Sequence, residues 1–130
     1  MRKFKFEKIV RDLIPEMMIQ KGAKLNVKNL EKKDVIFFLK EKLLEELQEV
    51  NEACDNVSLI EELADLYEVI RGIICAIGSD LEELERVRKQ KFDSKGGFLK
   101  APYIESIELE DDSKLINYYL NNPKKYPEIK

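Results

Sequence analysis

Histidine and tryptophan are both missing from this sequence of 130 residues. Without histidine, the chain cannot build a Ser/His/Asp or Cys/His catalytic site, nor a zinc site with an imidazole ligand. The two cysteines, Cys54 and Cys75, lack the paired spacing of a metal site, and we expect both to be reduced residues in or beside a helical core. Any catalysis must therefore use carboxylates, lysines or a bound metal.

Long apolar runs and a strong charge of one sign are lacking as well. No stretch approaches the roughly 18 consecutive apolar residues of a membrane span, and the start MRKFKFEK lacks the apolar segment of a signal peptide. The formal net charge is -3, with acidic and basic residues interspersed, which argues against binding of a nucleic-acid polymer by charge alone. We therefore expect a cytoplasmic protein that binds neither a membrane nor a nucleic-acid polymer.

The sequence does contain clear helical periodicity. Residues 32–54 carry apolar side chains at every third or fourth position, which predicts a long amphipathic helix. Further helices are expected at 15–22, 59–77 and 80–93, and a short helical segment is expected before Pro123. The predicted fold class is all-α: an antiparallel helical bundle whose wide apolar stripes are completed by dimerisation.

Two pairs of serine and glutamate predict where helices begin. Ser58 with Glu61, and Ser79 with Glu82, have the spacing of a capping box. In this motif the serine hydroxyl accepts a backbone N–H of the first helical turn. We therefore expect these serines to open the helices that follow them.

Two acidic pairs of equal spacing occupy the two long helices. Glu46 and Glu49 lie in the first helix, and Glu62 and Asp65 lie in the second. At about 100° per residue, each pair borders the apolar stripe of its own helix. The two pairs are also equally distant from the turn expected at 55–56, so an antiparallel hairpin would bring all four carboxylates to one level.

The four carboxylates allow two interpretations. Clustered like charges in a partly desolvated place are unfavourable unless a cation neutralises them, and all-oxygen ligands favour Mg²⁺ or Mn²⁺. Alternatively, the acids are the solvated faces of highly charged helices. Spacing alone leaves both interpretations open, and the symmetry of the pairs about the turn is what raises the metal site above the background of ordinary acidic helix faces.

The acidic motif also carries a family resemblance. E-x-x-E at 46–49, twelve intervening residues, and E-x-x-D at 62–65 in the form EELADLYEVI resemble the signature of the all-α nucleoside triphosphate pyrophosphohydrolases of the MazG superfamily. KIVRDLIPE at 8–16 and KQKFDSKGGFLKAPYI at 89–104 are similar to the two ends of its small phosphoribosyl-ATP pyrophosphohydrolase-like branch. The resemblance narrows the expected function to nucleotide hydrolysis.

The resemblance covers about residues 3–105. It therefore implies a MazG-like domain at 1–105 and a C-terminal extension of unknown role at 106–130. Lys95 stands where the branch often has arginine, a departure that leaves the geometry of this contact open.

The implied reaction is Mg²⁺-dependent cleavage of a nucleotide between its α and β phosphates, which gives a monophosphate and pyrophosphate. The implied metal ligands are Glu46, Glu49, Glu62 and Asp65. Glu46 and Glu49 are the catalytic candidates, with Glu46 preferred for orienting the attacking water. Glu45 and Glu61 are candidates for positions that support the ligands from outside.

Lysines at the C-terminal end of the resemblance are candidates for substrate binding. Lys91, Lys95 and Lys100 surround the GGF turn and could bind phosphates, or could form a solvated basic helix end that complements the helix dipole. Arg11 and Asp12 are interpreted as an N-terminal ion pair that positions the first helix, in preference to a substrate contact.

Three functions are compatible with these residues. The first is housecleaning hydrolysis of noncanonical nucleoside triphosphates by a homodimer or tetramer, with the site assembled across the subunit interface. The second is hydrolysis of phosphoribosyl-ATP in histidine synthesis. The third is a non-catalytic helical scaffold, which retention of all four acids and the GGF turn argues against.

Overall fold

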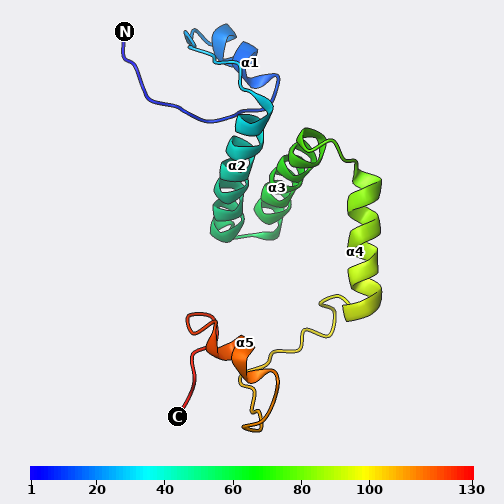
Figure 1. Ribbon diagram of the computed structural model, residues 1–130. Coiled ribbons are helices and arrows are strands. Elements are labelled where there is room, and N and C mark those ends of the chain that lie inside the picture. The colour runs from blue at the N-terminus through cyan, green and yellow to red at the C-terminus, as the bar shows by residue number, and fades with distance from the viewer. The chain divides into compact units, whose positions relative to one another are not determined.

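The computed structural model describes all 130 residues and contains five helices and no strand. The predicted all-α class is thus confirmed. None of the helices combines the length and the apolar composition that a bilayer span requires. The helices are α1 (Ile14–Gln20), α2 (Lys32–Glu52), α3 (Asn56–Ala76), α4 (Leu81–Lys95) and α5 (Ile116–Leu120) (Figure 1).

The chain divides into two compact units, Met1–Ser94 and Lys95–Lys130. The first unit contains α1, α2, α3 and nearly all of α4, and the second contains α5. The domain boundary expected between residues 105 and 106 stays a prediction. The acidic pairs and the N-terminal motif all belong to the first unit.

Helices α2 and α3 are the one pair of helices that packs together within residues 1–94. The linker Ala53–Asp55 joins them directly, so the chain turns back on itself and the two helices run antiparallel (Figure 1). The predicted hairpin therefore forms. It fixes the relative heights of the side chains on its two helices, which is what the acidic pairs require.

The residues that open α3 and α4 differ from those expected. The Asp55 carboxylate accepts the backbone N–H of Ser58 at 2.7 Å, and the Asp80 carboxylate accepts that of Glu83 at 2.8 Å. The prediction that Ser58 and Ser79 cap these helices was therefore wrong. An aspartate at the N-cap accepts a backbone N–H of the first turn as a serine hydroxyl can, and its negative charge also interacts favourably with the positive end of the helix dipole.

The apolar core of the chain is very small. Val69 of α3, 8% exposed, is the one buried residue. Cys54 and Cys75 are both exposed with free thiols, so neither is a core residue. The long helices carry enough apolar residues for a core, but packing one helix against one other covers only part of their surface.

Gly72 of α3 offers a test of the packing between the two helices. A Cβ at Gly72 would lie 3.5 and 3.6 Å from the two δ-carbons of Leu39, which is ordinary van der Waals contact. Because alanine has the higher helix propensity, we predict that Gly72→Ala raises the free energy of unfolding by roughly 0.5–1 kcal/mol. Urea denaturation followed by circular dichroism measures this change.

Gly78→Ala is the matched control. Gly78 has a φ of +76° and no atom near its would-be Cβ, so alanine there should destabilise through backbone conformation alone. If Gly72→Ala proved as destabilising as Gly78→Ala, α2 and α3 would have to approach one another more closely than the structure shows.

Candidate functional site

Three of the four predicted acids meet between α2 and α3. Carboxylate oxygens of Glu46, Glu62 and Asp65 all lie within 4.8 Å of one another, and each residue is half-buried. We call these three residues the acidic cluster. Glu49 lies outside it and is exposed.

Two members of the acidic cluster, Glu46 and Glu62, have raised pKa values. Burial raises the pKa of the Glu62 carboxyl, and the neighbouring carboxylates of Glu49 and Asp65 raise this pKa further. Burial also raises the pKa of Glu46, although the Lys42 ammonium acts in the opposite direction. Neutralisation by a cation would relieve both the desolvation and the repulsion. Three carboxylates at this spacing match the oxygen ligands that Mg²⁺ prefers.

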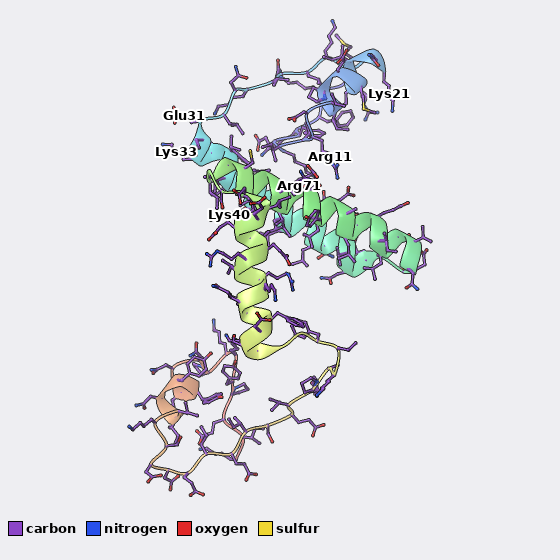
Figure 2. The ribbon with its side chains drawn as sticks, turned by 90° about the vertical axis from the view of Figure 1, so that its right-hand side faces the viewer. Arg11, Lys21, Glu31, Lys33, Lys40 and Arg71 are labelled. Carbon is purple, nitrogen blue, oxygen red and sulfur yellow. The ribbon has the colours of Figure 1, made fainter.

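Arg11 reaches the acidic cluster from the segment that precedes α1. Its Nη2 donates to Asp65 Oδ1 at 2.6 Å, across 54 residues of chain (Figure 2 labels Arg11). The expected ion pair between Arg11 and Asp12 does not form. Arg11 pairs instead with Asp65 of α3.

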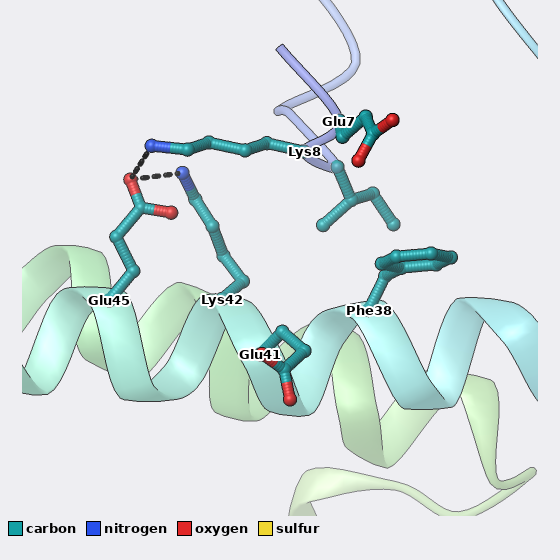
Figure 3. Close-up of a pocket in the computed structure, with 7 residues that line it drawn as sticks. Glu7, Lys8, Phe38, Glu41, Lys42 and Glu45 are labelled. Atoms are coloured by element: carbon teal, nitrogen blue, oxygen red, sulfur yellow. Dashed lines mark hydrogen bonds and ion pairs between the residues drawn. The ribbon is translucent and has the colours of Figure 1, made fainter. Parts of the chain in front are cut away.

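Lys8 and Lys42 converge on Glu45, one of the two predicted supporting acids. Their Nζ atoms lie 3.3 and 3.4 Å from the same Glu45 Oε1 (Figure 3). Lys42 Nζ also lies 3.6 Å from Glu46 Oε1 and so links Glu45 to the acidic cluster. The other predicted supporting acid, Glu61, is exposed on α3.

A hollow of about 300 Å³ opens between the N-terminal segment and α2. In Figure 3 the Lys8 and Lys42 side chains lie at one end of this hollow and the Phe38 ring at the other. Its size is at the lower end of the range for small-molecule sites. The hollow is lined by Glu7, Lys8, Ile9, Phe38, Glu41, Lys42 and Glu45.

A second hollow, of about 280 Å³, lies at the turn between α2 and α3. Glu49 and Glu62 both line it, together with Glu52, Ala53, Cys54 and Ser58. Glu49 therefore faces Glu62 across this hollow, which agrees with its effect on the pKa of Glu62. The fourth predicted acid is adjacent to the acidic cluster although it is not part of it.

The lysines predicted to bind substrate lie elsewhere in the chain. Lys91 is exposed on α4, which does not pack against α2 or α3. Lys95 and Lys100 belong to the second compact unit. The structure does not bring Lys91 to the acidic cluster, and the substrate role of all three lysines stays a prediction.

The basic residues beside the acids were not singled out for this role from the sequence. A local signal existed for Lys42, because it precedes Glu46 by one helical turn. No local signal existed for Lys8, whose partner Glu45 is 37 residues away.

Comparisons with protein-family models, curated proteins and solved structures find no match to this chain. The site is therefore argued from its geometry and chemistry.

The raised pKa of Glu62 predicts how stability depends on pH. Between the usual glutamate value of 4.5 and the higher pKa in the folded protein, the folded state holds more protons than the unfolded state. Stability contributed by this group is therefore lost as the pH rises through that window. We predict that Glu62→Gln removes this loss from the metal-free protein and also removes stabilisation by Mg²⁺.

Thermal melting from about pH 4 to pH 7, with and without Mg²⁺, measures both effects. Glu68→Gln is the matched control, because Glu68 is exposed on the same helix and forms no ion pair. The same Mg²⁺ shift in the wild type and in both variants would rule out Glu62 as a ligand.

Proposed function

We propose that this protein is a Mg²⁺-dependent nucleotide pyrophosphohydrolase. It cleaves nucleoside triphosphates, noncanonical ones in particular, between the α and β phosphates and releases a monophosphate and pyrophosphate. The observation that carries this proposal is the convergence of Glu46, Glu62 and Asp65 from two facing helices. The sequence resemblance to the MazG superfamily, whose signature includes these acids, supports the choice of reaction.

The donor set fits the proposed ion. Three carboxylates in a half-buried place supply oxygen ligands, and too few of them to complete an octahedral shell, so positions are left for substrate phosphates. Mg²⁺ bound there would neutralise phosphate charge and polarise the attacking water. Mn²⁺ has a similar ligand preference and is the expected substitute.

Glu46 is the residue best suited to orient the water and accept its proton. Its side chain is 13% exposed, which makes it far more enclosed than that of Asp65, at 43%. The resulting upward shift of its pKa favours a general base at neutral pH, because a stronger base accepts a proton more readily. The Lys42 ammonium acts against this upward shift of the Glu46 pKa and favours the ionised carboxylate that can accept a proton.

Activity measurements test the proposed reaction directly. The protein is incubated with Mg²⁺ and a panel of canonical and modified triphosphates that includes phosphoribosyl-ATP, and pyrophosphate and orthophosphate are measured separately. We predict release of pyrophosphate by the wild type and a reduction of kcat by roughly 100-fold or more in Glu46→Gln, the scale of general-base catalysis. Glu68→Gln should retain wild-type activity.

The products decide among the alternatives. Orthophosphate in place of pyrophosphate would assign cleavage to a different bond. Hydrolysis of phosphoribosyl-ATP alone would assign the enzyme to histidine synthesis. Without either product from any nucleotide, the non-catalytic scaffold becomes the better interpretation.

We also propose that the hairpin of α2 and α3 pairs with a second copy of itself. Each helix has an exposed apolar stripe at helical spacing: Phe37, Leu44 and Leu47 on α2, and Ile60, Leu63 and Tyr67 on α3. These side chains are 45–68% exposed. Two hairpins together would form a four-helix bundle that buries the stripes, and two such dimers would form a tetramer.

Analytical ultracentrifugation tests this assembly. We predict a homodimer or tetramer, and dissociation of that assembly by Ile60→Asp, because an unpaired carboxylate would be buried in the interface. Val27→Asp is the control, since Val27 is similarly exposed, at 71%, and lies outside the hairpin. A wild-type protein that sediments as a monomer would contradict the proposal.

A further inference from the structure

Three cations surround the acidic cluster, and two of them come from the N-terminal segment. Arg11 contacts Asp65, Lys8 contacts Glu45, and Lys42 contacts both Glu45 and Glu46. The contacts of Arg11 and Lys8 join parts of the chain 54 and 37 residues apart. The segment before α1 thus lies across the site rather than away from it.

The guanidinium of Arg11 has hydrogen-bonding capacity that the protein does not use. An arginine side chain carries five N–H donors, and its contact with Asp65 is the one hydrogen bond that this guanidinium makes. The Arg11 side chain is also 56% exposed. Its remaining donors are therefore open to solvent directly beside the acidic cluster.

Lys8 follows a residue of unusual backbone conformation and forms an ion pair with Glu45. The preceding residue, Glu7, has a φ of +45°, in the left-handed region that residues other than glycine seldom adopt. The chain therefore bends immediately before Lys8. The Lys8 ammonium lies at the edge of the 300 Å³ hollow beside that of Lys42.

We propose that Arg11, supported by Lys8 and Lys42, binds the polyphosphate chain of the substrate. This inference rests on the proposed function. It adds a binding role for the N-terminal segment, which sequence analysis interpreted as a structural ion pair. In the absence of substrate, Asp65 and Glu45 are the counter-ions of these cations. Phosphate oxygens replace the carboxylates as partners when the substrate is bound.

A negatively charged polyphosphate needs cationic side chains beside the acidic cluster. A polyphosphate that approaches the acidic cluster meets three carboxylates, on a chain whose net charge is -3. Arg11, which donates to Asp65, and Lys42, 3.6 Å from Glu46, counter the repulsion where it is strongest. The planar fork of arginine also matches two oxygens of one phosphate, a geometry that a lysine cannot reproduce.

Calorimetric titration with inorganic pyrophosphate in Mg²⁺ buffer tests the inference without turnover. The full chain is compared as wild type, Arg11→Gln, Arg11→Lys and Arg71→Gln. Arg71 is the matched control because it is an exposed arginine of α3 that forms no ion pair (Figure 2). We expect Arg11→Gln to weaken pyrophosphate binding by about tenfold or more.

The other variants separate charge from local structure. Arg71→Gln should bind pyrophosphate as the wild type does, and Arg11→Lys should recover part of the affinity because it keeps the cation. In steady-state hydrolysis, Arg11→Gln should raise KM for a triphosphate more than it lowers kcat. These results together would support a phosphate contact.

The opposite results would overturn the inference. A purely structural clamp would lower the melting temperature of metal-free Arg11→Gln and leave its affinity for pyrophosphate unchanged. Absence of pyrophosphate binding by the wild type, or loss in Arg11→Lys as complete as in Arg11→Gln, would also reject it.

Failure of the inference and failure of the proposed function are distinguishable. Nucleotide hydrolysis with an unchanged KM in Arg11→Gln would keep the function and reject the role of Arg11. Pyrophosphate binding that depends on Arg11, without hydrolysis of any nucleotide, would keep the phosphate site and reject the enzyme.

Discussion

The packing of α2 against α3 is the constraint on which the site depends. Because the linker Ala53–Asp55 is short, the two helices must lie antiparallel, and residues equally distant from the turn are brought to the same height. Glu46 on one helix thereby meets Glu62 and Asp65 on the other. Each of these side chains borders the packing seam, so the contact that stabilises the hairpin also desolvates the acids and raises their repulsion.

The neighbouring cations reduce that repulsion. Lys42 lies one helical turn before Glu46, while Arg11 arrives from a distant part of the sequence. Exposed ion pairs of this kind contribute little to folding stability individually. Their effect here is to hold positive charge next to the clustered carboxylates and so to reduce their mutual repulsion.

Sequence reasoning succeeded where the determining physics is local. Apolar spacing placed the two long helices, and the angle per residue placed Glu46, Glu62 and Asp65 together. Helix starts were missed because Asp55 and Asp80, rather than the serines, occupy the capping positions and accept the backbone N–H groups of Ser58 and Glu83.

Other features were beyond the reach of local patterns. The contact between Arg11 and Asp65 depends on the path of the chain between them, which helical periodicity does not encode. The sequence could not predict what buries the apolar stripes either. In the structure α2 and α3 leave these side chains exposed, so another part of the chain or a second copy would have to bury them.

The separation in sequence of these contacts has a consequence for the order of folding. The contacts between α2 and α3 join neighbours on either side of one short turn, so little loop-closure entropy opposes them, and such contacts form early. The contact of Arg11 with Asp65 closes a loop of 54 residues and is expected to form later. The acidic cluster is then assembled before the N-terminal segment reaches it, so a nascent chain presents its carboxylates to solution ions before it presents them to its own arginine.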